Sequence, residues 1–401
     1  MKRQTFNSSK YRFDLKGKTA ESILHQLAQK TFLIDWCFPN PVLANGKEVC
    51  DLLIVFDQTV IICQVKDLKL GKLGIHRQAE VEKNLRQLSG ARRQLFELKT
   101  PICLRNARRT IDTFDPTGIR EVFLVSILLG EEAEFFSGIE FLRELTIHVF
   151  NRTFTETVLK ELDTVSDFIQ YLRAKEALIR DGKSFTIMGG EEELLAFYLM
   201  NDRSFSRIEK ATHIVLTEGS WNEFRNSTAY RSKKEQDKYS YGWDDIINRA
   251  NEGSSEYELV ARELARPSRF QRRFLGKCFL DAWMIATDDR VHDSYRRIIP
   301  SEGTTYCFIF CDSEITREGR IGMLKVVCYV ARGIFKQNQK VLGIATEKRI
   351  SPTCSYDYCL LDFPTWTEIN EKEVTRLRKQ FDILKNPVVA KVEEVEYPES
   401  K

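Results

Sequence analysis

Apolar positions in the first 180 residues alternate between helical and strand spacing. They predict a helix beginning at Thr19, two β-branched runs joined by a tight turn at Asp57-Gln58, a long helix, two further strands and an amphipathic helix. These elements are expected at residues 19–34, 51–56, 59–66, 75–98, 120–129, 146–150 and 166–179. This order is typical of an α/β domain whose central mixed sheet is flanked by helices.

A glycine-rich segment, residues 181–190, follows and is interpreted as a domain boundary. It divides a first domain, residues 1–182, from a second α/β domain, residues 191–390, whose helices and strands the same spacing rules predict. Within the second domain, the polar stretch 226–241 is expected to be a long loop. Residues 391–401 contain four Glu and no apolar period, which predicts a frayed acidic tail.

Composition narrows the class of protein only moderately. The 61 Lys and Arg residues nearly balance 58 Asp and Glu residues, so bulk charge does not hold this chain to a polyanion. The first residues lack the apolar core of a secretory signal, and no run of about 18 apolar residues occurs. We therefore expect a cytoplasmic protein without a membrane partner. The ten Cys lie mostly in apolar strings and lack the spacing of a zinc site.

Two polar residues interrupt an otherwise apolar strand in the first domain. Gln64 and Lys66 are two positions apart, so their side chains leave the same face of the strand. Burying an amide and an ammonium without partners costs several kcal/mol, so a compensating group is expected beside them. The turn at Asp57-Gln58 places Asp51 opposite Gln64 in the hairpin, so these two side chains can share a site.

A carboxylate, an amide oxygen and an ammonium together suit phosphodiester chemistry. Mg²⁺ binds a few protein oxygens and keeps several of its waters. Asp51 and Gln64 could supply two of these oxygens and leave the remaining positions to water. Lys66 would then orient a water or offset negative charge in the transition state. The pattern predicts a magnesium-dependent phosphodiesterase, with Mn²⁺ as a substitute metal.

These residues resemble the PD-(D/E)xK nuclease superfamily in its Gln-x-Lys variant. The resemblance covers residues 15–130: a first helix bearing Glu21, then Asp51, the hairpin, Gln64-Val65-Lys66 and a basic helix. It implies a restriction-endonuclease-like fold, with Asp51 and Gln64 as metal ligands, Lys66 as the catalytic lysine and Glu21 as an accessory catalytic residue and metal ligand. The chain departs from the motif at Cys50, where the family has Pro, and at Gln64, whose neutral amide binds metal less strongly.

Basic residues around the long helix favour a nucleic-acid substrate. Residues 66–109 hold twelve Lys and Arg against four acids, a local charge of +8. Such a segment binds a polyanion with affinity that falls as salt rises, although it could equally form a solvated helix face. The residues expected nearest to the substrate are Arg77, Lys83, Arg86, Gln87 and Arg93.

A second basic cluster lies in the C-terminal half and contains Arg262, Arg266, Arg269, Arg272, Arg273 and Lys277. It could extend the nucleic-acid track, or it could dock the two domains or a partner subunit. No Walker loop occurs, so any ATPase that assists the protein would be a separate chain, as would a sensor subunit.

Each candidate also has a simpler interpretation. Asp51 could cap a turn, Lys66 could extend to solvent from a strand end, and Glu21 could stabilise a helix N-terminus. Glu48 is a spare ligand if its loop folds back.

The leading hypothesis is a magnesium-dependent nuclease acting on DNA, with RNA as the open alternative substrate. By analogy it is a prokaryotic restriction or antiviral defence effector, and a homodimer is expected because one site cuts one strand. The competing hypotheses are an inactive nuclease-fold protein that binds nucleic acid or acts as a scaffold, and a protein whose main activity lies in the second domain.

Overall fold

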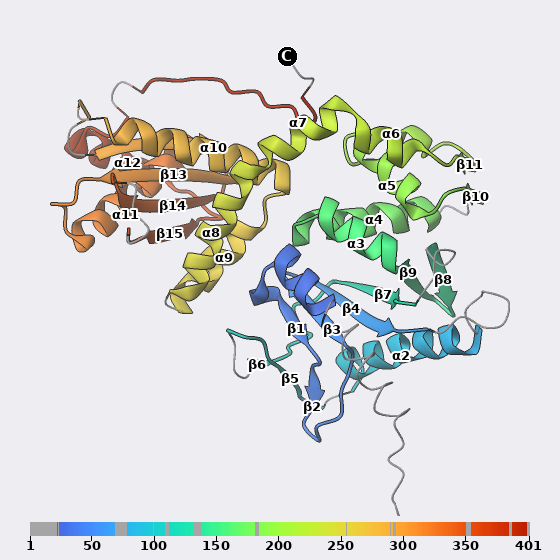
Figure 1. The fold of residues 1–401 in the computed structure, drawn as a ribbon. Helices are drawn as coiled ribbons and strands as arrows, with labels where there is room; N and C mark the ends of the chain where they lie inside the picture. Colours follow the sequence, from blue (N-terminus) through green and yellow to red (C-terminus); the bar gives the residue numbers. More distant parts are fainter. Residues whose placement is uncertain are drawn as a thin grey trace, which may run out of the picture. The chain divides into compact units, whose positions relative to one another are not determined.

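The structure is a computed structural model of mixed α/β type. It describes residues 22, 24–68, 78–98, 100–108, 112–130, 138–180, 184–253, 255–288, 290–291, 294–349, 354–384 and 387–398. These residues form two compact units, Met1–Tyr230 and Arg231–Lys401 (Figure 1). Each unit has its own sheet and its own hydrophobic core.

A six-stranded mixed sheet with the order β1-β3-β4-β7-β9-β8 forms the centre of the first unit. The hairpin at Asp57-Gln58 is confirmed, because Phe56 pairs with Thr59 in antiparallel β3 and β4. β4, β7 and β9 are parallel, and the outer strands β1 and β8 are antiparallel to their neighbours. The strands are β1 (Cys37–Pro39), β3 (Leu52–Phe56), β4 (Thr59–Lys66), β7 (Glu121–Leu128), β8 (Gly138–Leu142) and β9 (Leu145–Asn151).

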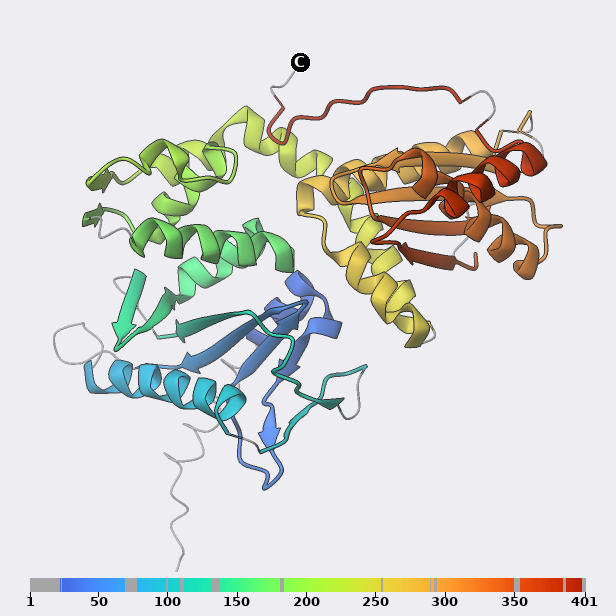
Figure 2. The same cartoon turned by 180° about the vertical axis from the view of Figure 1, so that it is seen from behind.

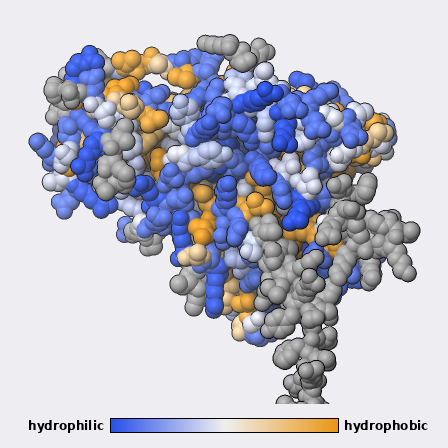
Figure 3. Space-filling view, viewed as in Figure 1, coloured by the Kyte–Doolittle hydropathy of each residue, from blue (hydrophilic) through white to orange (hydrophobic). Residues whose placement is uncertain are grey.

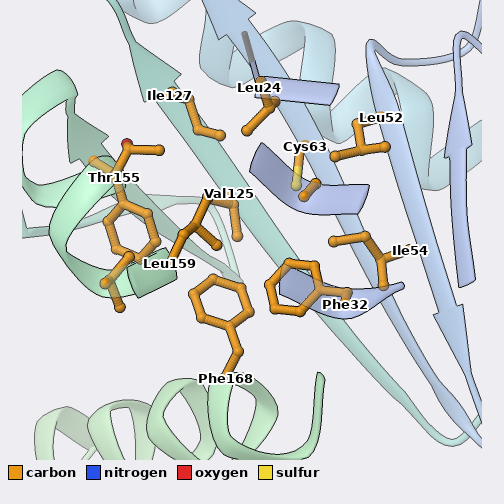
Figure 4. A pocket seen from close by; sticks show the side chains of 13 residues that line it. Leu24, Phe32, Leu52, Ile54, Cys63, Val125, Ile127, Thr155, Leu159 and Phe168 are labelled. Atoms are coloured by element: carbon orange, nitrogen blue, oxygen red, sulfur yellow. The ribbon is translucent and has the colours of Figure 1, made fainter. Parts of the chain in front are cut away.

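Helices cover both faces of this sheet (Figure 2). On one face lies α2 (Gln78–Phe96), whose Leu85 and Leu88 pack in one cluster with Val60 and Ile62 of β4. On the other face lie the first helix, residues 24–32, α3 (Arg152–Glu161) and α4 (Val165–Arg180). Figure 4 shows side chains from these helices meeting the sheet around a residual space of about 10 Å³, which is too small for a ligand.

The first unit continues beyond the glycine-rich segment, so its boundary lies later than the sequence pattern indicates. Gly189 and Gly190, both with positive φ, lead into α5 instead of a linker. α5 is held to α4 by a buried ion pair between Lys175 and Glu191. Glu193 of α5 accepts hydrogen bonds from two backbone amides that lie further along the chain. These contacts join residues 191–221 to the first unit, and the boundary between the two units lies after Tyr230.

Shorter elements complete the first unit. β10 and β11 pair in parallel, and β2, β5 and β6 form a small separate sheet. The remaining elements of the unit are η1 (Ile34–Trp36), β2 (Val42–Leu43), β5 (Ile102–Leu104), β6 (Asp112–Thr113), β10 (Ser184–Ile187), α5 (Glu191–Met200), η2 (Ser206–Ile208), β11 (His213–Leu216) and α6 (Ser220–Asn226).

The second unit is also α/β, as the sequence predicts. Its four-stranded sheet has the order β12-β13-β14-β15, with β13 and β14 parallel. An aromatic layer joins α8 and α10 to the sheet, with Trp243 and Phe279 both against Phe308. α11 packs on β14 with the second hydrophobic cluster, and α12 packs on α11. The elements are α7 (Thr228–Gln236), which begins in the first unit, α8 (Lys238–Glu252), η3 (Ser255–Tyr257), α9 (Glu258–Ala265), α10 (Arg269–Ala286), β12 (Ser294–Pro300), β13 (Thr304–Cys311), α11 (Arg317–Ile334), β14 (Lys340–Glu347), β15 (Asp357–Asp362) and α12 (Glu368–Phe381).

The long loop expected at residues 226–241 is wrong, because this stretch contains α7 and the start of α8. Its polar residues form ion pairs with residues of the same unit, which the pattern of a single helix does not indicate. Lys233 is buried against Asp237, and Asp244, seven residues further, binds both Arg269 and Arg272 of α10. Gly276 of α10 lets α8 approach closely, since a Cβ there would lie 2.4 Å from the carbonyl oxygen of Tyr239.

The second basic cluster does not form a nucleic-acid track along α10. Arg269, Arg272 and Arg273 are buried, and all three form ion pairs inside the second unit. The frayed acidic tail is also wrong for residues 391–398, because Glu394 pairs with Arg273 and Lys277. Ion pairing with the buried Arg273 and with Lys277 holds a segment whose local sequence has no apolar period.

The visible surface is mostly hydrophilic, with hydrophobic residues in small groups (Figure 3). Within the part of the chain that the structure describes, no helix has both the length and the apolar character needed to cross a bilayer.

Candidate active site

The hairpin β3–β4 brings the acid and the amide into direct contact. Leu52 pairs with Cys63, so Asp51 lies beside Gln64 at the end of the ladder. Gln64 Nε2 donates a hydrogen bond to Asp51 Oδ2 at 2.6 Å, and the backbone N–H of Val65 donates to the same oxygen at 2.5 Å. Both side chains are buried, with 5% of Asp51 and 8% of Gln64 exposed. A carboxylate thus lies in a site largely withdrawn from water.

Lys66 follows on the same face of β4, two residues after Gln64. It is half-buried at the end of the strand, next to the exposed Asp67. Among the residues that the structure describes, none forms a hydrogen bond or an ion pair with its ammonium group.

Two further polar residues continue the row that Asp51 and Gln64 begin. Ser126 of β7 is the register partner of Gln64, so the two side chains are neighbours on one face of the sheet. Asn84 of α2 is fully buried above this row and donates from Nδ2 to Ser126 Oγ at 2.8 Å. Asn84 Oδ1 has no hydrogen-bond partner among the described residues. The row therefore retains one buried acceptor.

Sequence reasoning missed Ser126 and Asn84, although a signal existed for both. Ser126 interrupts the apolar run of residues 122–129, and Asn84 interrupts the apolar stripe of α2 between Val81 and Leu88. A polar side chain on a buried face needs a hydrogen-bond partner. Asn84 and Ser126 are hydrogen-bond partners of each other.

The first helix contacts the site through His25. His25 Nε2 lies 2.8 Å from the backbone carbonyl oxygen of Asp51, and because a carbonyl only accepts, the proton of this bond is on Nε2. The bond ties the start of β3 to the first helix. Glu21, predicted as an accessory ligand one helical turn earlier, lies outside the described residues. Glu48, the spare ligand, is exposed.

Cys50 stands where the motif has Pro. It is fully buried, and burial, reinforced by the nearby Cys63 and by the Asp51 carboxylate, raises the pKa of the thiol well above its usual value. Cys50 is therefore a neutral core residue at neutral pH and packs with Phe38 and Leu53 in the cluster under α2.

The donor chemistry of the site fits a hard divalent cation. Asp51 carries a carboxylate and Gln64 carries an amide oxygen, both of the type that Mg²⁺ selects, and the amide would have to turn for its oxygen to face the same cation, because Nε2 faces Asp51 in the structure. Within the described ranges, no group of three or more His, Cys, Asp and Glu side chains could hold a metal ion. A metal at this site would thus be held by one carboxylate, one amide, water and any ligand from outside those ranges.

The α2 residues predicted to contact the substrate lie on its solvent face. Lys83, Arg86, Gln87 and Arg93 are all exposed, whereas Asn84 lies on the face that packs on the sheet. Arg86 is 3.6 Å from Glu82, an exposed pair of little energetic value. Arg77 lies outside the described residues. Arg108 is not part of this face, because it binds Asp35 Oδ2 at 2.7 Å.

A separate cavity of about 700 Å³ lies elsewhere in the first unit. It is lined by residues of β8, α4, β10 and the start of α5, including Lys175 and Glu191, and its described lining includes neither Asp51 nor Gln64. We assign the candidate chemistry to the hairpin and not to this larger cavity, because the Lys175 and Glu191 side chains already neutralise each other.

The hairpin thus combines a buried acid–amide pair with the half-buried ammonium of Lys66 on one face of a mixed sheet. Ser126 and Asn84 extend the polar row, and His25 binds the backbone carbonyl of Asp51 at the start of β3. Comparisons of the chain with protein-family models, with curated proteins and with solved structures each found no match.

Proposed function

We propose that the chain is a Mg²⁺-dependent nuclease that hydrolyses phosphodiester bonds of DNA, with Asp51, Gln64 and Lys66 in its active site. The observation that carries the proposal is the 2.6 Å contact between Gln64 and Asp51, with Lys66 on the same face of β4. An acid and an amide oxygen are ligands that Mg²⁺ accepts, and an ammonium can offset the charge that develops in the transition state.

The arrangement of elements supports a restriction-endonuclease-like first unit. A helix precedes an antiparallel hairpin, and the hairpin's second strand pairs in parallel with β7 after a long helix. This order agrees with the one that the motif residues suggest, and it places the polar row beneath α2.

Asp51 and Gln64 would hold the metal through oxygen, with Glu21 as a further ligand in the proposal. Bound Mg²⁺ would supply Lewis-acid polarisation of the phosphate and a lower pKa for its water. Lys66 would then offset the negative charge that grows on the phosphate oxygens as water adds and the P–O bond breaks. The buried position of Asp51 strengthens these electrostatic interactions, because little water screens them.

The exposed residues Lys83, Arg86, Gln87 and Arg93 are the proposed contacts to the DNA backbone. Phosphate contacts of this kind position the substrate and carry no sequence preference. In the same proposal the protein is a cytoplasmic defence effector, and the second unit recognises substrate, partner or trigger, with any ATPase or sensor on another chain.

One observation favours a second candidate function, an inactive nuclease-fold protein that binds nucleic acid or acts as a scaffold. Asp51 Oδ2 already accepts hydrogen bonds from both Gln64 and Val65, an arrangement that satisfies this oxygen without metal. In that case DNA would bind through α2 in the absence of divalent ions, and no cleavage would follow under any metal.

Metal removal separates the two candidates. Supercoiled plasmid incubated with the full chain should be nicked or linearised with Mg²⁺ or Mn²⁺, and it should stay intact with EDTA. Ca²⁺, which binds oxygen ligands but activates water poorly, serves as the matched control and should allow DNA binding without cleavage. DNA binding with no cleavage under Mg²⁺ and Mn²⁺ would favour the inactive candidate.

A further inference from the structure

The second unit holds its own acidic tail in a cationic groove on α7 and α10. Lys233 of α7 and Arg273 and Lys277 of α10 define this tail groove. Lys277 Nζ donates to Glu394 Oε1 at 2.7 Å, and Arg273 Nε lies 3.3 Å from Glu394 Oε2. On the other side of Val395, Lys233 Nζ is 4.0 Å from Glu396 Oε1 and 5.7 Å from the centre of the Tyr397 ring.

The tail groove recognises peptide backbone as well as charge. Arg273 Nη2 donates to the carbonyl oxygen of Val395 at 2.7 Å, and Nη1 donates to that of Glu396 at 3.1 Å. One guanidinium thus binds two successive carbonyls and the carboxylate that precedes them. This geometry fits an extended peptide with two Glu separated by one residue, and a phosphate backbone offers no such row of carbonyls.

The groove residues also have partners outside the tail. Arg273 contacts Asp237 Oδ1 at 3.3 Å, and Lys277 donates to Gln236 Oε1 at 3.0 Å. Asp237 in turn pairs with Lys233. Among the described residues, Asp237 is the acid outside the tail that pairs with Lys233 and Arg273, and Lys277 has the neutral Gln236 beside it, so an empty groove would keep a preference for an acidic ligand.

The tail itself is attached at few points. Residues 387–398 form no helix or strand, and Val388 and Val389 are 97% and 87% exposed. Twelve residues separate Phe381, the last residue of α12, from Glu394, which allows an extended reach of about 40 Å. A segment with this reach and few apolar contacts can leave one groove and enter another.

We propose that the tail groove is a docking site for an acidic peptide, and that the tail of a second copy of this chain can fill it. In such an exchange, the tail of one chain would make with the groove of the other the same contacts that it makes within its own chain. The main free-energy cost of the exchange would then be the entropy lost on association. This inference is independent of the proposed nuclease activity, since it concerns only the second unit.

Two full-length charge variants test the exchange. Lys277→Glu disables the groove and keeps the tail, and Glu394→Lys disables the tail and keeps the groove. In each variant alone, residues 277 and 394 of one chain carry charges of the same sign and repel each other. In a mixture of the two variants, residue 394 of each chain can meet a residue 277 of opposite charge on the other chain. Light scattering after size exclusion should show single chains for each variant alone and a 1:1 dimer for the mixture. The double variant Lys277→Glu/Glu394→Lys should behave as single chains at the same concentration.

A labelled peptide of residues 387–401 gives a second readout. It should bind the chain truncated after residue 386, and a Glu394→Lys peptide or a scrambled peptide of equal charge should bind at least tenfold more weakly. A mixture that stays as single chains overturns the exchange. A scrambled peptide that binds equally well, or a 20-nucleotide single-stranded DNA that displaces the peptide, overturns peptide recognition in favour of simple charge attraction.

Discussion

Replacing Asp51 by Asn or Lys66 by Met is expected to lower the rate of plasmid cleavage at least about 100-fold, the usual cost of removing one group that stabilises charge in a transition state. Asn keeps the shape of Asp51 and still accepts from Val65, but it removes the charge that attracts a cation. Met keeps the length of Lys66 and removes its ammonium. Since Lys66 has no partner among the described residues, this variant should fold normally.

Matched variants control for these effects. Asp57→Asn changes an acid of the same hairpin in the left-handed turn position, which Asn adopts readily, and Lys30→Met removes an exposed lysine from the first helix. Both should retain the parent cleavage rate. Equal activity of Asp51→Asn, Lys66→Met and the two controls would remove the hairpin from the proposed mechanism and direct attention to the second unit.

Glu191→Gln is expected to destabilise the first unit by about 3–5 kcal/mol, the usual cost of leaving a buried charge without its partner. Lys175 and Glu191 are fully buried, and Glu191 also accepts a hydrogen bond from Tyr171 at 3.1 Å. Burial lowers the pKa of Lys175 and raises that of Glu191, so desolvation outweighs their attraction. A neutral amide leaves the ammonium without a counter-charge. Urea unfolding, with hydrogen exchange of the α4 and α5 amides, measures the loss.

The double variant Lys175→Met/Glu191→Gln separates the charge effect from the packing effect. It removes both charges and keeps an oxygen for Tyr171, so it should recover at least half of the stability that the single variant loses. Glu156→Gln, the same change at an exposed carboxylate of α3, should stay within about 0.5 kcal/mol of the parent. A single variant as stable as Glu156→Gln would show that the Lys175–Glu191 pair contributes little to the first unit.

The pairing of Asp51 with Gln64 could be predicted from the sequence because hairpin register follows from the turn. Once Asp57-Gln58 is the turn, counting outwards along both strands places Asp51 beside Gln64, and the structure brings them together. The first helix and the long helix were predictable for a similar reason, since their apolar residues repeat with helical spacing.

Contacts between distant segments could not be predicted, because no local pattern encodes them. Asn84 and Ser126 are 42 positions apart, and only the packing of α2 on β7 shows that they meet. The tail is anchored through Arg273, 121 positions before Glu394, so its fixed position had no local signal. The boundary after Tyr230 was missed because Gly189 and Gly190 resemble a linker although they form a turn into α5.

Mn²⁺ binding by the full chain tests the central claim most directly, because it examines the metal site without relying on a known substrate. Mn²⁺ titration followed by electron paramagnetic resonance should reveal a site in the parent chain that Asp51→Asn abolishes, that Gln64→Glu strengthens about tenfold or more through its added charge, and that Asp57→Asn leaves unchanged. Equal Mn²⁺ binding by the parent, Asp51→Asn and Gln64→Glu would contradict a metal centre at this hairpin.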